Sequence, residues 1–457
     1  MKRPPYTPVT RAHPDIKAPE SKISGSLIFA LRFAARIYLA AFIGAAKIKL
    51  ETQSLFIHAF RRALCGESRC IVAFRHAYGF EPQVLTWFVL YKLRRTAAQR
   101  GIRLPANPRI RFIYGYEVLR WGGMIARVIM PRLGALPVHH AKVDSRGLAG
   151  IYDAIAEGSY PIAIAPEGQV SYNAWEMPRL EPGVIRIGLG ASEQLKKKGE
   201  TLPVEILPVD IRLTYGRKSG KAMENLLRKV EKLCGLNAEK SGEDLTSRFL
   251  RCREVILHIN ETRYGITSDP GLPWEDRIAV LLKAALDHCA GILGIRGGGR
   301  EEHFSRMYHL RQLCWDRIFV PGKEAGEKQE TPLEQAAGDL RAGEAWHAAR
   351  HLEIADFAWY FRTPPPENDA PLSRKIGYVQ NLWDFSNRTM GGTYSDRVNI
   401  HPQSVTIYAG PAVNLNAALE EYRKDRKETV RKCLVRLQEA YADLSNRSAQ
   451  NGDGDNA

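Results

Sequence analysis

The stretch Cys70-Ile-Val-Ala-Phe-Arg-His-Ala-Tyr-Gly-Phe-Glu-Pro82 decides the fold class expected for this chain. Its first five residues are apolar, which is typical of a strand buried on both faces of a sheet. Pro82 suits the first turn of a helix, because the N–H that proline lacks would be unpaired there. We therefore expect a strand, a short turn and a helix in this order, the repeating unit of an α/β protein.

The turn within this stretch carries two groups with acid–base chemistry, His76 and Glu81. Gly79 lies between them and allows a tight turn, so the two side chains can meet although they are five positions apart. A carboxylate that accepts the Nδ1 proton of a histidine leaves the other ring nitrogen free to take a proton from a hydroxyl group. The pattern predicts a general base, although taken alone it is more often a polar turn whose histidine caps a strand.

The alternation of apolar runs and helical segments continues along the chain and predicts an α/β fold with a mixed, twisted sheet flanked by helices. Between residues 218 and 399 the pattern changes to helical periodicity, which predicts a mostly α-helical inserted domain. Further strands are expected at Arg109–Tyr114, Ala135–His139, Tyr160–Ala165, Val204–Ile211 and Ser404–Ala409.

The predicted domain organisation has five parts. The two ends of the chain are polar and offer few residues to a core, so both are expected to be flexible. The parts are a flexible arm at 1–23, a membrane-interfacial helical segment at 24–65, an α/β domain at 66–216 plus 404–445, a helical insertion at 217–403 and a disordered tail at 446–457.

The positive charge of the chain is concentrated in its first quarter. The whole chain has 66 Lys+Arg and 50 Asp+Glu, a formal net charge of +16. Residues 1–111 contain 20 Lys+Arg and 5 Asp+Glu, a balance of +15, which leaves +1 for the remainder. A basic region of this kind favours partners that carry phosphate, such as anionic lipid or nucleic acid. The cysteines are scattered without a Cys-x-x-Cys pair, which favours a reducing compartment over a disulfide framework or a zinc finger.

The segment Leu27–Leu50 is the candidate for membrane contact. Arg32 and Arg36 interrupt it one helical turn apart, and its longest uncharged run, Ile37–Ala46, is too short to cross a hydrocarbon core of about 30 Å. These features predict a helix in the membrane interface, with its apolar side chains inserted and its basic side chains at the headgroups. Two alternatives stay open: a helix packed on the protein's own core, and a tilted span that accommodates the two arginines.

A second polar block, Pro166-Glu-Gly-Gln-Val-Ser171, follows the apolar run Tyr160–Ala165 as His76 follows its own strand. A glycine and its neighbouring backbone N–H groups at the end of a strand can bind an oxyanion or a phosphate, so this block is a candidate binding loop. Gly134-Ala-Leu-Pro-Val-His-His140 lies between the two blocks, and Leu207-Pro-Val209 follows them.

In this order and at these spacings, the four blocks resemble the lysophosphatidate acyltransferase (PlsC-like) family of glycerolipid acyltransferases. The motifs of that family are His-x4-Asp, a Gly-x-x-Phe-Ile-Asp-Arg-like block, Phe-Pro-Glu-Gly-Thr-Arg-Ser and Val-Pro-Val. The resemblance covers about 66–216 and resumes near 404–445. It implies the glycerolipid acyltransferase fold and an O-acyltransferase of phospholipid biosynthesis. Such an enzyme moves a fatty acyl group from acyl-CoA or acyl-ACP to a lipid hydroxyl group without an acyl-enzyme, a metal or a further cofactor.

The resemblance also implies a role for each matching residue. His76 is the expected general base, and Glu81 is expected to orient it and to stabilise its charge. The turn expected at Leu207-Pro-Val209 would shape the acyl side of the site. The expected substrate-binding residues are His140, Pro166, Glu167, Gly168, Gln169, Ser171 and Arg179.

The chain departs from the family pattern at three places. Glu81 stands where the family has Asp, and both His140 and Gln169-Val170 stand where it has arginines that bind the acceptor phosphate. Arginine suits phosphate because its planar fork donates two hydrogen bonds at once. The departures therefore favour an unphosphorylated or differently arranged lipid acceptor, unless Arg179 takes over this contact.

Two other functions compete with an acyltransferase. The departures would suit a catalytically silent lipid- or acyl-carrier-binding protein on the same scaffold, and the basic first quarter would suit a nucleic-acid-binding protein. We favour a peripheral or monotopic enzyme on the cytoplasmic side of a membrane. Its expected partners are an anionic membrane surface, acyl-CoA or an acyl carrier protein, and a lysolipid or other lipid acceptor, with no nucleic acid.

Overall fold

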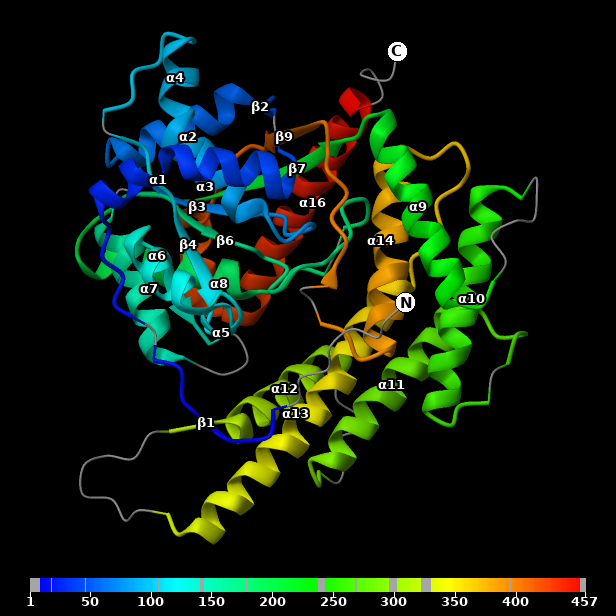
Figure 1. Cartoon of the computed structure of the whole chain (residues 1–457). Coiled ribbons are helices and arrows are strands. Elements are labelled where there is room, and N and C mark those ends of the chain that lie inside the picture. The colour runs from blue at the N-terminus through cyan, green and yellow to red at the C-terminus, as the bar shows by residue number, and fades with distance from the viewer. Residues whose placement is uncertain are drawn as a thin grey trace. The chain divides into compact units, whose positions relative to one another are not determined.

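The chain forms two compact units in the computed structural model (Figure 1). The helical unit contains Met1–Lys17 and Gly220–Ile400, and the sheet unit contains Ala18–Ser219 and His401–Ala457. The structure describes residues 9–17, 19–45, 47–105, 107–139, 144–158, 160–177, 179–236, 243–267, 269–295, 302–321, 330–393 and 396–452.

The sheet unit is built on one eight-stranded sheet with the order β2-β9-β7-β3-β6-β4-β5, and β10 pairs with β7. β7 runs antiparallel to β9 and to β10, and the other neighbouring strands are parallel. The predicted α/β class, with a mixed sheet, flanking helices and a helical region, is confirmed. The strands are β2 (Ile48–Leu50), β3 (Arg69–Phe74), β4 (Arg111–Gly115), β5 (Leu136–Val138), β6 (Ile162–Ile164), β7 (Val204–Thr214), β9 (Ser404–Ala409) and β10 (Val413–Asn414).

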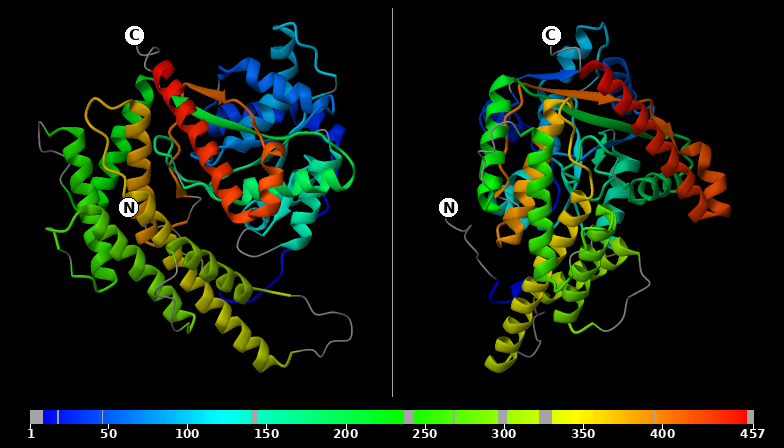
Figure 2. Two further views of the ribbon diagram at one scale, coloured as in Figure 1. Left: turned by 180° about the vertical axis from the view of Figure 1, so that it is seen from behind. Right: turned by 90° about the vertical axis from the view of Figure 1, so that its right-hand side faces the viewer.

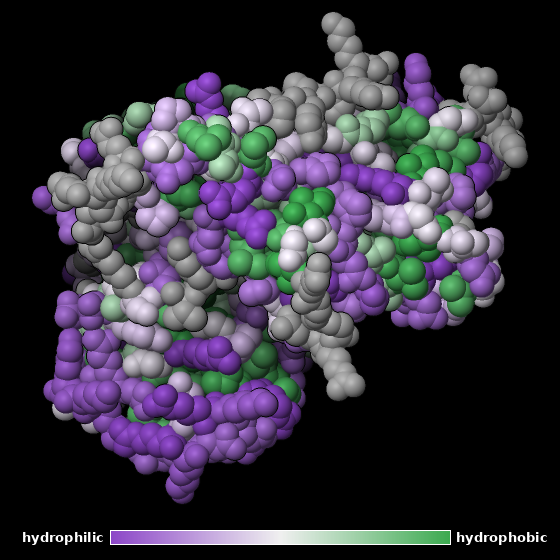
Figure 3. All heavy atoms as spheres, turned by 90° about the horizontal axis from the view of Figure 1, so that it is seen from below, coloured by the Kyte–Doolittle hydropathy of each residue, from purple (hydrophilic) through white to green (hydrophobic). Residues whose placement is uncertain are grey.

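β3 is apolar after its first residue, and β7 is buried along most of its length, because helices cover both faces of the sheet. Helices α1 (Gly25–Tyr38), α2 (Gln53–Leu64) and α3 (Glu81–Tyr91) lie over one face, and α8 (Gly183–Lys197) and α16 (Arg426–Gly452) lie over the other (Figures 1 and 2). The second face carries a core that includes Ile71, Ile185, Leu195, Leu437 and Tyr441. On the face of the molecule drawn in Figure 3, apolar residues form patches separated by hydrophilic ones.

The helix expected over Leu27–Leu50 ends earlier. α1 continues as the π-helical segment η1 (Leu39–Ile43), which Gly44 ends with a left-handed φ of 75°. A Cβ atom at position 44 would lie 2.5 Å from the His401 side chain, so glycine is required there for space as well as for conformation. The chain is then free to form β2, whose three residues pair with β9.

The segment Leu207-Pro-Val209, expected to be a turn, lies inside β7 and is buried. Pro208 has no N–H to donate to a neighbouring strand. It is compatible with a central strand because its nitrogen faces the point at which the partner of β7 changes from β10 to β9. Residues before it pair with β10 and residues after it pair with β9, and Gly410 N–H donates to Pro208 O at 2.9 Å.

The ends of the chain are more ordered than expected wherever the structure describes them. His13–Pro14 form β1, which pairs with β8 (Phe319–Val320) in the helical unit, so residues 9–17 are not a free arm. α16 extends to Gly452, because each added residue of an existing helix gains a hydrogen bond at little further cost. The first eight and last five residues of these predicted flexible ends lie outside the described residues.

The helical unit matches the helical periodicity of the sequence closely, and its longest helix, α13, begins with a capping box between Thr331 and Glu334. α11 and α12 both pack on α13. The helices of this region are α9 (Arg217–Leu233), which begins three residues before the unit boundary, α10 (Leu245–Arg263), α11 (Trp274–Ile292), α12 (His303–Ile318), α13 (Pro332–Phe361) and α14 (Leu372–Thr389).

Candidate active site

His76 and Glu81 meet at the carboxyl end of β3. His76 is the second residue after the strand. Glu81 is the first residue of α3, and Pro82 is the second. Gly79 has a φ of 91°, the left-handed conformation that closes the turn between them. His76 Nδ1 lies 2.8 Å from Glu81 Oε2, so the contact expected from the five-residue spacing is present.

Two backbone N–H groups hold the Glu81 carboxylate in place. Tyr78 N donates to Oε1 at 2.5 Å, and Gly79 N donates to Oε2 at 2.9 Å. The Glu81 side chain is fully buried, whereas the His76 side chain keeps 18% of its surface exposed. With the carboxylate as an acceptor, Nδ1 carries the proton and Nε2 is the nitrogen that can act as a base.

The surroundings of His76 raise the pKa of its imidazole. Burial alone lowers the pKa of His76, but attraction to Glu81, the hydrogen bond to Glu81 and the charge of Glu167 raise it more, so the pKa is above its ordinary value of 6.5. A proton that arrives at Nε2 is therefore stabilised, which is the property that a general base needs in the transition state.

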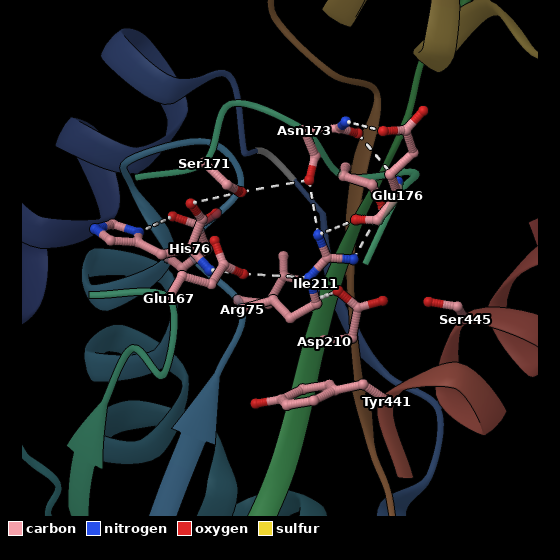
Figure 4. A network of polar contacts seen from close by, with 12 residues as sticks. Arg75, His76, Glu167, Ser171, Asn173, Glu176, Asp210, Ile211, Tyr441 and Ser445 are labelled. Atoms are coloured by element: carbon pink, nitrogen blue, oxygen red, sulfur yellow. Dashed lines mark hydrogen bonds and ion pairs between the residues drawn. The ribbon is translucent and has the colours of Figure 1, made fainter. Parts of the chain in front are cut away.

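The loop that follows β6 lies directly beside this turn (Figure 4). The Glu167 carboxylate is buried, and its Oε1 accepts the backbone N–H of His76 at 3.1 Å. Ser171 N donates to His76 O at 2.8 Å and Ser171 Oγ donates to the same oxygen at 3.4 Å, so three hydrogen bonds join the loop to the backbone of His76. Because β3 and β6 are adjacent and parallel, their carboxyl ends bring the two sequence blocks together.

Arg75 links this loop to β3 and was not identified from the sequence. Its guanidinium is buried, forms an ion pair with Glu167 at 3.3 Å, and donates to the carbonyl oxygens of Asn173, Ala174 and Glu176. Burial raises the pKa of Glu167 more than its neighbours Arg75, Ser171 and His76 lower it. The signal in the sequence was a charged residue at the end of an apolar strand, which requires a buried partner.

The hydrogen bonds of the loop residues show what each of them contacts within the protein. Gly168 has a φ of 73°, and its N–H donates to Ala165 O within the turn at 3.1 Å, so this N–H is not directed at a substrate. The Glu167 carboxylate faces Arg75 and the backbone of His76, and Pro166 O accepts from Glu181 N. Glu167 and Pro166 are buried and support the site from within, whereas Gly168 is exposed and closes the turn; their expected contacts with a substrate stay a prediction.

The remaining predicted binding residues have different surroundings. Ser171 is buried, Gln169 is half-buried, and Arg179 lies 3.9 Å from the Glu181 carboxylate. His140 lies outside the described residues, whereas the preceding His139 stacks on Tyr116 with ring centroids 3.9 Å apart. The structure thus joins His76, Glu81, Glu167 and Ser171 into one site, and Arg179 pairs locally.

Among the described residues, no group of three or more His, Cys, Asp or Glu side chains is placed to hold a metal ion. No protein-family model matches the chain, and no curated protein matches it. The function must therefore be inferred from the arrangement of side chains. It consists of a partly exposed imidazole with a fixed tautomer, held by a buried carboxylate at the carboxyl edge of a mostly parallel sheet.

Proposed function

We propose that this protein is an O-acyltransferase that moves a fatty acyl group from acyl-CoA or acyl-ACP to a hydroxyl group of a glycerolipid-type acceptor. The observation that carries the proposal is the 2.8 Å contact between His76 Nδ1 and Glu81 Oε2, with Nε2 left as the basic nitrogen. The family resemblance of the four sequence blocks supports the same reaction.

In the proposed reaction His76 Nε2 takes the proton of the acceptor hydroxyl group as its oxygen attacks the thioester carbonyl carbon. A C–O bond forms, the C–S bond breaks, and the departing thiolate receives the proton from Nε2 as the free thiol. The Glu81 carboxylate stabilises the imidazolium between these two proton transfers. Glu167 and Arg75 contribute by fixing the backbone around His76.

A membrane location follows from the acceptor and is supported by α1. The segment Gly25–Ile43 is the one helical segment among the described residues that is long and apolar enough to cross a membrane. No residue of α1 is buried, which argues against the alternative of a core helix. The arginines within it favour the interfacial arrangement, and we propose peripheral or monotopic attachment on the cytoplasmic side, with an anionic membrane surface as partner.

The test is acyl transfer by the purified protein with acyl-CoA and acyl-ACP over a panel of lysolipids and other lipid alcohols. Thiol release and acylated lipid should appear together for wild type and fall by at least about 100-fold in His76→Ala. His58→Ala removes an exposed histidine of the same unit and should retain wild-type rates. Circular dichroism would confirm that both variants are folded.

The alternative outcomes separate the competing functions. A His76→Ala variant as fast as wild type would rule out the general-base mechanism. Tight lipid or acyl-carrier binding without turnover on any acceptor would instead favour the silent binding protein. Retention of DNA or RNA at physiological salt without vesicle binding would favour a nucleic-acid-binding protein.

A further inference from the structure

The helix α1 carries an exposed apolar stripe. Phe29, Phe33 and Ile37 recur every four residues, which places them on one face of the helix, and each is between 66% and 72% exposed. In η1, Phe42 is also 67% exposed and stacks on Tyr38 with ring centroids 5.5 Å apart. Side chains of this size and exposure, gathered on one face, indicate a surface that has a partner.

A second exposed apolar stripe lies on α6 (Gly123–Arg132), far from α1 in the sequence. Met124 and Ile125 are 73% and 72% exposed, and Val128 one turn later is 41% exposed. The opposite side of α6 provides Ala126 and Pro131 to the interior. An amphipathic helix with its larger apolar residues outside is the reverse of what packing within the unit would produce.

The two helices are joined at their ends. Lys22 N donates to Pro131 O at 3.0 Å and Ser24 N donates to Arg132 O at 2.9 Å, so the chain enters α1 along the last turn of α6. Figure 1 accordingly shows α6 beside the N-terminal end of α1. We call the residues Phe29, Phe33, Ile37, Phe42, Met124, Ile125 and Val128 the two-helix surface.

The charged side chains on the two helices themselves are all positive. Arg32 on α1 and both Arg127 and Arg132 on α6 are exposed, and neither helix contains an acidic residue. Apolar side chains between arginines complement a bilayer with anionic headgroups, where the apolar groups enter the acyl region and the guanidinium groups reach phosphate. An acidic protein surface would satisfy the charges but not the large exposed aromatic side chains.

The two-helix surface is firmly connected to the candidate active site. Tyr91 OH in α3 donates to Ile28 O at 2.6 Å, and the Arg36 guanidinium lies over the Trp87 ring at 5.2 Å. α3 is the helix that begins with Glu81, the residue that holds His76. A membrane surface that binds α1 therefore has a fixed position relative to His76 and Glu81.

We propose that α6 is a second lipid-binding helix, which together with α1 docks the sheet unit on an anionic bilayer in one orientation. This inference extends the proposed function by naming how the site meets the membrane. A single helix would leave rotation about its axis unrestrained, whereas two helices that enter the interface together define a plane. Its test does not depend on acyl transfer.

The test is flotation of the full chain with phosphatidylcholine vesicles that contain phosphatidylglycerol. Met124→Asp/Ile125→Asp and Phe33→Asp should each lower the partition coefficient by at least about tenfold, because apolar burial is lost and a negative charge is placed against anionic lipid. Val435→Asp, which changes an exposed apolar residue of α16 in the same unit, should bind as wild type does. Ile125→Cys labelled with an environment-sensitive dye in a Cys65→Ser background should report entry into an apolar phase.

Flotation of Met124→Asp/Ile125→Asp equal to that of wild type would overturn the role of α6, and so would a dye at position 125 that reports water. A wild-type dimer in sedimentation that this double variant dissociates, with flotation unchanged, would show that a second copy covers α6 instead. Acyl transfer to a detergent-dispersed acceptor, measured in the same variants, separates failure of docking from failure of the proposed chemistry.

Discussion

Replacing Glu81 by glutamine tests the electrostatics of the candidate site in a way that the structure makes quantitative. The carboxylate accepts three hydrogen bonds, from His76 Nδ1, Tyr78 N and Gly79 N. The glutamine amide has one acceptor oxygen. If this oxygen takes the place of Oε2, the hydrogen bonds from His76 Nδ1 and Gly79 N are kept, but the NH2 group then faces the Tyr78 N–H. One buried donor is left unpaired, which should lower the free energy of unfolding by about 1–3 kcal/mol.

The same substitution removes the charge that stabilises the His76 imidazolium. A hydrogen bond to a charged group contributes about 1.5–3 kcal/mol, which corresponds to a fall in kcat of about 10- to 150-fold. The pKa of His76 should also fall, because burial continues to lower it while the largest opposing influence is gone. The acid limb of kcat/KM against pH should therefore move to lower pH in Glu81→Gln.

The pH dependence of stability has a definite sign. In wild type the native pKa of His76 is raised above the unfolded value near 6.5. Its stabilising contribution is therefore complete below pH 6.5 and is lost as the pH rises through the native pKa. Urea unfolding at a series of pH values should show this loss in wild type and not in Glu81→Gln.

The measurements are the pH–rate profile, an NMR titration of the His76 imidazole and urea unfolding, with Glu67→Gln as the control. Glu67 is an exposed carboxylate of the same unit that pairs with Arg61 at 3.3 Å, so its loss should change little. A Glu81→Gln variant whose acid limb and imidazole titration stay in place, or move to higher pH, would refute the assigned role of Glu81. The titration remains informative even where no turnover is found.

Two further predictions concern stability. Arg75→Met leaves the Glu167 carboxylate buried without its cation and three carbonyl groups without a donor, so the free energy of unfolding should fall by about 3–5 kcal/mol. Arg75→Lys keeps the charge and should lose less in the same urea titration, and equal losses would contradict the ion-pair argument. Thr331→Ala removes the capping box of α13 and should destabilise the helical unit by about 1 kcal/mol, whereas Thr331→Ser should restore wild-type unfolding.

The strands that form the sheet were predictable where apolar residues predominate. Residues 70–74 are apolar throughout and lie in the central strand β3, and residues 204–211 are apolar apart from Glu205 and Asp210 and lie in the central strand β7. β2 was missed because Ile48–Leu50 continues an amphipathic run of helical character, and three residues carry too little periodicity to show a change. Its strand conformation depends on pairing with β9, more than 350 residues later in the chain.

The candidate site was predictable only in its local part. His76 and Glu81 are five positions apart, and the glycine between them limits how the turn can close, so their contact could be expected from the sequence. The role of Arg75 depends on carbonyl groups about 100 residues away, and backbone acceptors leave no mark in a sequence. For the same reason Gly168 was assigned to substrate binding, although its N–H is used within its own turn.

The pairing of β7 with β9 has a consequence for how this protein can change over evolutionary time. Thr214 and Ser404 are opposite each other in the ladder, and Gln403 N donates to Thr214 O at 2.7 Å, so the chain leaves and returns at one point of the sheet. The helical unit is in effect the loop of a β-hairpin, and doubling the length of a loop costs only about 0.6 kcal/mol. In evolution the helical unit can be lengthened, exchanged or lost while the sheet unit keeps the strand order that brings His76 beside Glu167. Selection on the helical unit and on the chemistry can proceed separately. β1 belongs to the helical unit although it precedes the sheet unit in the sequence, so it would have to change together with those helices.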